Sequence, residues 1–259
     1  MTQLLISVRN IEEALLALEM DVDIIDLKDP DVGALGALDL VTTRQILQVV
    51  KGQVLANAAT SFHTLVSATV GERHASLSEL VEDINVRAQS GVDIIKIGVS
   101  ALFYGSRFFA EMSKLAHAGV KMVAVFFADE KLDLDLLPAL QEAGFYGAML
   151  DTRNKQQHLF AMQAKKTLHL FTQLCKKHHL KSGLAGSLKP QHIEILSEVG
   201  STYIGFRGGV CENSIRNAAL SKAKVIEVKN MLLIHNKHDG KAREMLPGVA
   251  QSSLIKYSV

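Results

Sequence analysis

The sequence of 259 residues contains little cysteine, little proline and no strong excess of charge of one sign. Its two cysteines, Cys175 and Cys211, lie far apart, and neither belongs to a CxxC pair or to a cluster of histidines. A disulfide framework and a structural metal site are therefore not expected, and so low a cysteine content is typical of a reduced, cytoplasmic protein. We expect neither a metal nor a cofactor.

The formal net charge is only +1 and no basic run stands out, so a nucleic-acid partner is not expected. The apolar start of the chain reaches charged residues at Arg9, Glu12 and Glu13, too early for a signal peptide or a membrane span. Only four prolines occur, and no Pro-rich or Ser-rich linker divides the chain. We therefore predict one cytoplasmic domain without a membrane or nucleic-acid partner.

Hydrophobic residues make up 48% of the chain and charged residues 21%, which is enough apolar surface for a large core. Short apolar runs typical of buried strands alternate with segments whose apolar residues recur every three or four positions, as in amphipathic helices. We count eight of each. The predicted strands lie near residues 4–8, 23–28, 65–70, 93–98, 121–127, 147–151, 182–186 and 203–207, and the helix-like segments include 11–20, 77–90, 107–118 and 158–179.

Several helix-like segments end on a glycine before the next strand, as helix C-termini often do. These glycines are Gly91, Gly119, Gly144 and Gly200. Eight βα units in a chain of this length indicate a single-domain (β/α)8 barrel of the TIM type, with a doubly wound open sheet as the alternative. We place the barrel at residues 1–235.

The last part of the chain, residues 236–259, loses the helical period. We predict that it forms a short C-terminal appendage, which packs on the barrel or on a neighbouring subunit. We also expect the protein to form a homo-oligomer.

A repeat in the sequence indicates which residues end the strands. The segments 22–28 and 92–98 both begin with Val-Asp-Ile-Ile, two βα units apart. Asp21, Gly91, Gly144 and Gly200 precede the even-numbered strands. Counting seven residues past each of these four reaches the predicted ends of strands two, four, six and eight: Lys28, Gly98, Asp151 and Arg207. Side chains from alternate strands share one layer inside a (β/α)8 barrel, so these four should meet at its C-terminal mouth.

The residues two positions deeper in the same strands are Asp26, Lys96, Met149 and Gly205. Because strand side chains alternate, they should lie on the same inner face, one layer lower. We expect Gly98 and Gly205 to leave room for a ligand. The prediction depends on register, since a slip of one residue would turn a side chain toward the helices.

Lys28 carries the most specific chemical prediction. Burial and a nearby cation such as Lys96 lower the pKa of a lysine, which can then act as a nucleophile and form an imine with a carbonyl substrate. Lys96 can move protons, and Asp26 and Asp151 can orient the amines or shuttle protons themselves. The alternatives are a Lys28 that reaches water and a purely structural ion network, although buried ion pairs add little net stability. Lys155, in the loop after Asp151, is either a solvated surface charge or part of the mouth.

The loops after strands seven and eight indicate an anion site. Small residues there let backbone N–H groups approach an anion, and an arginine adds a planar cation. Loops at this place frequently bind phosphate in (β/α)8 barrels. We predict a phosphorylated small-molecule substrate held by Gly186, Ser187, Arg207, Gly208 and Gly209.

An ordered set of short motifs extends from residue 4 to about residue 230. They include Asp23-Ile-Ile-Asp-Leu-Lys-Asp-Pro30, Ile95-Lys-Ile-Gly98, Met149-Leu-Asp-Thr152, Leu184-Ala-Gly-Ser187 and Phe206-Arg-Gly. Together they resemble the (5-formylfuran-3-yl)methyl phosphate synthases. The resemblance implies a (β/α)8-barrel lyase that condenses two molecules of glyceraldehyde 3-phosphate into a furan aldehyde phosphate, with loss of phosphate and water. It also implies a place in the synthesis of methanofuran-type C1 carriers in methanogens and methylotrophic bacteria.

The same resemblance assigns roles to single residues. The family's Schiff-base lysine falls on Lys28 and its proton-transfer lysine on Lys96. The supporting aspartates match Asp26 and Asp151, and a further active-site lysine matches Lys155. The loops after strands two and eight depart from the family's pattern, so the parts expected to touch phosphate differ most.

Two alternatives to this function stay open. One is another Schiff-base aldolase or isomerase that acts on triose phosphates on the same barrel. The other is a barrel without turnover that serves as a binding subunit. A furan product would distinguish the leading hypothesis from both.

Overall fold

The computed structural model describes residues 1–56, 64–99 and 105–244. Its eight strands form a closed barrel in which every strand is parallel to its neighbours, and β8 returns to β1. This confirms the predicted (β/α)8 barrel and excludes the open sheet. The strands are β1 Gln3–Val8, β2 Ile24–Leu27, β3 Leu65–Thr69, β4 Ile94–Gly98, β5 Met122–Phe127, β6 Gly147–Asp151, β7 Lys181–Leu184 and β8 Tyr203–Phe206.

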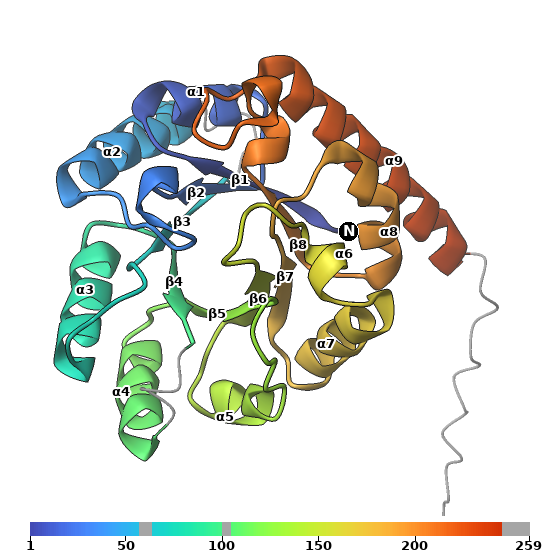
Figure 1. Cartoon of the computed structure of the whole chain (residues 1–259). Coiled ribbons are helices and arrows are strands. Elements are labelled where there is room, and N and C mark those ends of the chain that lie inside the picture. Colours follow the sequence, from blue (N-terminus) through green and yellow to red (C-terminus); the bar gives the residue numbers. More distant parts are fainter. Residues whose placement is uncertain (57–63, 100–104, 245–259) are drawn as a thin grey trace, which may run out of the picture.

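The helices form a ring around the barrel, as Figure 1 shows. They are α1 Ile11–Glu19, α2 Leu40–Ala56, α3 Leu77–Gln89, α4 Ser106–His117, α5 Leu136–Glu142, α6 Leu159–Met162, α7 Lys165–Lys177, α8 Ile193–Val199 and α9 Lys222–Glu244. Short 3-10 turns lie in the connections, namely η1 Pro30–Val32, η3 Pro190–His192, η4 Gly208–Val210 and η5 Glu212–Ser214.

The predicted helix over 158–179 is in fact two helices, α6 and α7. The chain is extended at Gln163, which ends α6. The side-chain amide of Gln163 donates to the carbonyl of Ala128 at 2.7 Å. This long-range hydrogen bond explains the break, and the sequence period could not reveal it because both flanking segments keep an apolar face.

The residues that end the helices before the even-numbered strands adopt the left-handed conformation that the count of strand ends assumed. Gly91, Gly144 and Gly200 have φ between +74° and +96°, and Asp21 has φ of +49° at the position where glycine is missing. Glycine adopts this conformation without a steric cost, which makes it the usual residue just past a helix. The common starting point explains why the same count reaches equivalent positions on the four strands.

The apolar core has two layers. The larger layer lies between strands and helices and contains the outward strand residues, such as Ile25 and Ile95. The smaller layer fills the barrel and contains the inward ones, such as Ile24 and Ile94. Because side chains alternate along a strand, the residues next to Ile25 and Ile95 on the inner face are polar: Asp26 and Lys96.

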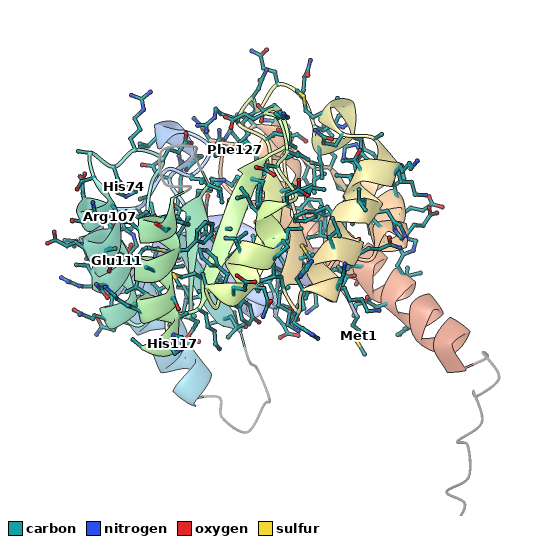
Figure 2. All side chains as sticks on the ribbon, turned by 90° about the horizontal axis from the view of Figure 1, so that it is seen from below. Met1, His74, Arg107, Glu111, His117 and Phe127 are labelled. Atoms are coloured by element: carbon teal, nitrogen blue, oxygen red, sulfur yellow. The ribbon has the colours of Figure 1, made fainter. Side chains whose placement is uncertain are left out.

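One side of the barrel mouth is closed by the loop after β2. Leu35, only 1% exposed, belongs to the core inside the barrel together with Phe127. A Cβ atom on Gly98 would lie 2.9 Å from Leu35 Cδ1. Gly98 therefore makes room for Leu35, which corrects the expectation that it leaves room for a ligand. Figure 2 shows Phe127, which ends β5, and Met1, which precedes β1, at opposite ends of the barrel.

The end of the described chain differs from the predicted boundary. Helix α9 continues past residue 235 to Glu244. Asn236 accepts a hydrogen bond from the Thr2 amide at 2.7 Å and donates one to the Thr2 carbonyl at 3.0 Å. These hydrogen bonds tie the helix at Asn236 to the residue before β1, and an apolar period does not reveal a polar contact of this kind. Residues 245–259 of the predicted appendage lie outside the described residues.

Among the helices of the described ranges, none is long and apolar enough to cross a membrane.

Candidate active site

A cavity of about 300 Å³ opens at the C-terminal mouth, on the side that Leu35 leaves free. This size lies at the small end of ligand pockets. The cavity brings together the predicted layer of even-strand residues, apart from Gly98. Its lining includes Asp26, Lys28, Lys96, Met149, Asp151, Gly205 and Arg207, together with Lys155, Gly186, Ser187, Gly208 and Gly209 from the loops.

The lower cluster in the cavity is a buried ion pair. Lys96 Nζ lies 2.6 Å from Asp26 Oδ1, and the two residues are 3% and 0% exposed. The hydroxyls of Ser7 and Ser67 donate to Asp26 at 2.8 and 2.7 Å. Both serines are register neighbours of Asp26 in the flanking strands, so the sheet itself places these donors. The result is a neutral pair whose carboxylate is held at a fixed position.

Lys96 lies in surroundings that disfavour its charged form. Burial lowers the pKa of Lys96 below its ordinary value, the carboxylate of Asp26 opposes this change, and the cation of Lys28 adds to it. A lysine with a lowered pKa holds its proton less tightly and is better suited to take up a proton from a substrate. Lys96 thus has the electrostatic setting of a base.

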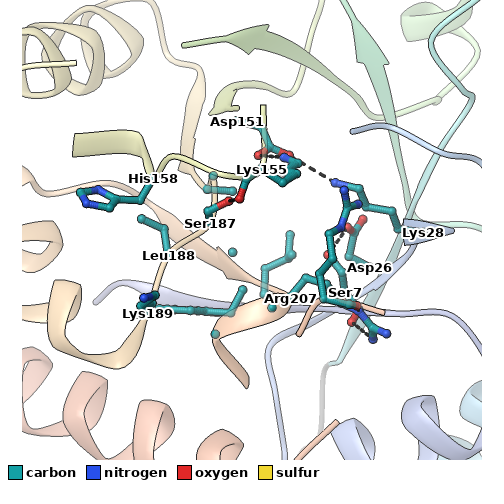
Figure 3. A pocket seen from close by; sticks show the side chains of 18 of the residues that line it. Ser7, Asp26, Lys28, Asp151, Lys155, His158, Ser187, Leu188, Lys189 and Arg207 are labelled. Atoms are coloured by element: carbon teal, nitrogen blue, oxygen red, sulfur yellow. Dashed lines mark hydrogen bonds and ion pairs between the residues drawn. The ribbon is translucent and has the colours of Figure 1, made fainter. Parts of the chain in front are cut away.

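The upper cluster is centred on Asp151, which bridges two lysines. Lys28 Nζ lies 3.2 Å from Oδ2, and Lys155 Nζ lies 2.7 Å from Oδ1. The backbone amide of Thr152 donates to Oδ1 at 2.7 Å. Burial alone would raise the pKa of Asp151, but Lys155, Lys28 and the amide together hold it well below its ordinary range. Asp151 is therefore a permanent anion between two amines, which Figure 3 shows side by side.

Lys28 is 7% exposed, so the alternative of a lysine that simply reaches water does not hold. Its amine faces the cavity from the end of β2, where the backbone amide of Lys28 donates to the Val8 carbonyl at 3.0 Å. An amine that is fixed by one carboxylate and faces a small cavity is placed to meet a bound carbonyl group.

Lys155 belongs to the site rather than to the open surface. Its side chain is 18% exposed, and its amine donates to the Thr152 carbonyl as well as to Asp151. Ser187 Oγ donates to the Lys155 carbonyl at 2.9 Å, which ties the loop to β7. Burial lowers the pKa of Lys155 to about 8, with Asp151 opposing the change and Lys28 adding to it. Lys155 can therefore exchange a proton close to physiological pH.

The loops after β7 and β8 form a candidate cradle for an anion. Gly186 and Ser187 both have positive φ, at +114° and +48°. Within the described ranges, the backbone N–H groups of Ser187, Gly208 and Gly209 donate to no protein acceptor. A Cβ atom on Gly209 would lie 2.1 Å from the Leu188 carbonyl oxygen, so the two loops touch. Backbone N–H groups without acceptors, in glycine-rich loops that line a cavity, are typical of a phosphate site.

Arg207 lines the cavity, but its guanidinium has other partners. It donates to the carbonyls of Arg216 at 2.8 Å, Ser7 at 3.1 Å and Ala218 at 3.2 Å, and to both carboxylate oxygens of Glu13. All five N–H groups of the guanidinium are thus used within the protein. Arg207 anchors the β8 loop to α1 and β1, and a side-chain contact to phosphate would require it to give up one of these bonds.

Sequence reasoning missed several residues of the cavity wall. Ser7 could have been found, because it is an inward position of an odd-numbered strand and the count used only even-numbered ones. Arg216 lies in an irregular loop, where no period places a side chain. The missed polar residues are Ser7, Gln156, His158, Lys189, Ser214 and Arg216.

Neither a metal site nor a reactive thiol stands out. In the part of the chain that the structure describes, no group of three or more His, Cys, Asp or Glu side chains could hold a metal ion. Cys175 and Cys211 are both buried and free, and burial raises the pKa of each thiol.

Fold and site together define a class: a (β/α)8-barrel enzyme whose lysines and carboxylates meet at the C-terminal mouth, where such barrels act on their substrates. Residues 4–229 match the family described as 4-HFC-P synthase, and the chain belongs to this family.

Named relatives agree with this assignment. A protein of Methylorubrum extorquens named "Putative (5-formylfuran-3-yl)methyl phosphate synthase" is 39% identical over 226 residues, which cover 87% of this chain and 89% of that protein. The (5-formylfuran-3-yl)methyl phosphate synthase of Methanocaldococcus jannaschii is 33% identical over 245 residues, covering 88% of this chain and 98% of that protein.

Solved structures with the same fold are more distant in sequence. The phosphoribosyl anthranilate isomerase of Thermus thermophilus has a TM-score of 0.61 at 11% identity and covers 90% of this chain and 99% of its own. The 3-hexulose-6-phosphate synthase of Salmonella typhimurium has a TM-score of 0.60 at 16% identity, covering 90% and 100%. At such identities the similarity concerns the fold alone.

Proposed function

We propose that this protein condenses two molecules of D-glyceraldehyde 3-phosphate into (5-formylfuran-3-yl)methyl phosphate through a lysine Schiff base. The reaction would take place in the cytoplasm and supply the furan of methanofuran-type or methylofuran-type C1 carriers. One observation carries the proposal: Asp151 bridges Lys28 and Lys155 directly above the buried Lys96–Asp26 pair, within a single small cavity. The identity of the product is taken from the names of the relatives.

The balance of the reaction fits a site without a redox group. Two triose phosphates bring six carbons and two phosphates, and the product keeps all six carbons and one phosphate. One phosphate and two molecules of water leave. No oxidant or reductant is required, so amines and carboxylates can perform every step by moving protons and breaking carbon–oxygen bonds.

Lys28 is the proposed imine-forming amine. Its attack on a carbonyl carbon releases the carbonyl oxygen as water and leaves a carbon–nitrogen double bond. This imine draws electrons from the adjacent carbon, whose proton passes to a base. Lys96 is suited to that role, because burial lowers its pKa and it lies in the same cavity. The resulting enamine attacks the aldehyde of the second triose and forms the carbon–carbon bond.

Lys155 is the proposed acid for the late steps. With a pKa of about 8, it is mostly protonated at neutral pH and can give a proton to a departing oxygen. Asp151 stays ionised throughout, so it keeps both lysines in place and stabilises the positive charge of the imine. Loss of water then aromatises the ring, which makes the last step effectively irreversible.

The retained phosphate is proposed to bind the free N–H groups at Ser187, Gly208 and Gly209, with Gly186 allowing the close approach. Arg207 fixes the position of this loop through its bonds to Glu13 and to backbone carbonyls. An anion in this cradle would place the carbon chain of the triose toward Lys28, which lies on the opposite side of the cavity in Figure 3.

The function is tested by incubating the purified protein with D-glyceraldehyde 3-phosphate and following furan absorbance and inorganic phosphate together. We expect a furan band and one phosphate for every two trioses consumed. Products that keep both phosphates and show no furan band would favour an aldolase or isomerase on the same barrel. No conversion of any triose phosphate would favour a barrel without turnover that binds a ligand.

A further inference from the structure

Arg216 is a cation of the cavity that the proposed chemistry has not used. Lys28, Lys96, Lys155 and Arg207 each form an ion pair with a carboxylate. Arg216 is partly buried, lines the same cavity, and forms no ion pair with any described residue. Its guanidinium makes one hydrogen bond to a described acceptor, from Nη2 to the Gly33 carbonyl at 3.1 Å. Most of its donors are thus available to a ligand.

The side chain of Arg216 extends across the entrance of the cavity. Its backbone packs on the phosphate cradle, since a Cβ atom on Gly208 would lie 3.4 Å from Arg216 Cβ. Its guanidinium reaches Gly33, in the loop after β2 on the other side of the mouth. Asn217 joins the same two loops through a hydrogen bond to Asp31. Arg216 therefore lies over the upper cluster rather than out in solvent.

The charges around this position are unbalanced. The lower pair of Lys96 and Asp26 is neutral, whereas the upper cluster sets Lys28, Lys155 and Arg216 against the single carboxylate of Asp151 inside the cavity. Asp31, at the rim, is already engaged by Arg9 at 3.6 Å and by Asn217. An unmatched positive charge in a small cavity attracts a dianion, and a planar guanidinium matches a phosphate with two parallel hydrogen bonds.

We propose that Arg216 binds a second phosphate group, the one that leaves during the reaction, while the first phosphate rests on the N–H groups of the β7 and β8 loops. This inference rests on the proposed function, because only a reaction between two phosphorylated molecules needs two such sites. Arg216 exchanges the Gly33 carbonyl for phosphate oxygens when the second triose enters.

At the leaving-group position, the role of Arg216 is electrostatic. A base removes a proton from one carbon, the neighbouring carbon–oxygen bond breaks, and its electron pair stays on the departing phosphate as a double bond forms between the carbons. Arg216 stabilises the charge that develops on this phosphate. A guanidinium is suited to this because it stays protonated while Lys155 next to it gives up a proton.

The proposal is tested first without turnover, with inorganic phosphate as the probe. The wild type, Arg216→Gln and Arg216→Lys are titrated by calorimetry, and stoichiometry is checked by phosphorus NMR. We expect two phosphates per chain for the wild type, one for Arg216→Gln, and a second site at least about tenfold weaker for Arg216→Lys. The matched control is Arg107→Gln, which removes an exposed arginine of α4 that does not line the cavity.

Two results of this titration would overturn the proposal. One is a wild type that binds a single phosphate, and the other is an Arg216→Gln protein that binds two with unchanged affinity. Near-UV circular dichroism shows whether each variant has kept its fold, and Arg216→Lys preserves the charge if the glutamine variant unfolds. This readout needs no catalysis. If the wild type makes no furan, the proposed function is refuted. If Arg216→Gln nevertheless binds one phosphate fewer than the wild type, the second phosphate site is still supported.

A second experiment, which measures reaction rates, separates binding of the leaving group from formation of the imine. In Arg216→Gln we expect phosphate release to slow by on the order of 10² to 10³, as when a group that stabilises developing charge is removed. Borohydride should still trap the first triose on Lys28. Equal loss of adduct and of phosphate release would show a general structural defect and would contradict the assigned role.

Discussion

The two lysine–carboxylate clusters of the cavity are built in opposite ways. The lower one pairs Asp26 with Lys96, adds two serine hydroxyls and leaves the carboxylate fully buried. The upper one gives Asp151 two lysines and faces the cavity. A neutral, saturated pair fixes geometry and controls the pKa of one amine, whereas a cluster with excess positive charge can receive anions and exchange protons. We propose that the lower cluster holds the base Lys96 in place and the upper one performs the covalent step.

The largest effect is expected from removing the amine of the upper cluster. Lys28→Ala deletes the proposed nucleophile, so kcat for furan formation should fall on the order of 10⁴-fold or more, as for other covalent catalysts that lose the nucleophile. Steady-state assays of furan absorbance measure this. The matched control is Lys114→Arg, on the exposed face of α4, which should keep wild-type activity. A Lys28→Ala protein within tenfold of wild type would remove Lys28 from the chemistry.

The lower cluster should matter more for stability than the upper one. Asp26→Asn leaves Lys96 buried without a counter-charge, so the free energy of unfolding should fall by about 3 kcal/mol or more. Asp151→Asn should cost less, because the side chains of Lys28 and Lys155 are 8% and 18% exposed, against 4% for Lys96. Urea denaturation of both variants measures the difference.

A double variant tests the same comparison from the other side. Asp26→Leu combined with Lys96→Met replaces the buried pair by apolar side chains, and such replacements are often neutral or stabilising. We expect the double variant to regain most of the stability lost in Asp26→Asn while its activity stays abolished. Equal losses in the free energy of unfolding for Asp26→Asn and Asp151→Asn would contradict the proposed difference between the two clusters.

The smallest expected effect concerns pH. The pKa of Lys155 is lowered to about 8, so its amine loses its proton as pH rises through that value. If Lys155 acts as the acid, kcat should fall about tenfold per pH unit above pH 8. Lys155→Arg keeps the charge to much higher pH, so its alkaline limb should flatten, whatever its absolute rate. If the alkaline limb of the pH profile is unchanged in Lys155→Arg, a group other than Lys155 causes the loss of activity at high pH.

Much of the fold and of the site could be predicted from local features of the sequence. The period of two within strands and the helix-ending residues Asp21, Gly91, Gly144 and Gly200 were enough to place the ends of the even-numbered strands. These signals are local, because a glycine in the left-handed conformation fixes where the next strand begins. The family resemblance added the chemistry, which spacing cannot supply.

Other features depend on contacts between distant segments. Gly98 is small because Leu35 fills its space, and Arg207 is engaged because Glu13 of α1 lies beside it. The sequence around Gly98 and Arg207 does not indicate these contacts. The position of Arg216 is of the same kind, since an irregular loop carries it across the mouth.

The most direct test of the account is to identify the lysine that forms the imine. The protein is incubated with D-glyceraldehyde 3-phosphate and sodium borohydride, and the reduced adduct is located by peptide mass spectrometry. We predict a single modified residue, Lys28, and no adduct in Lys28→Arg. An adduct on Lys96 or Lys155 of the wild type, or as much adduct in Lys28→Arg as in the wild type, would contradict the central claim.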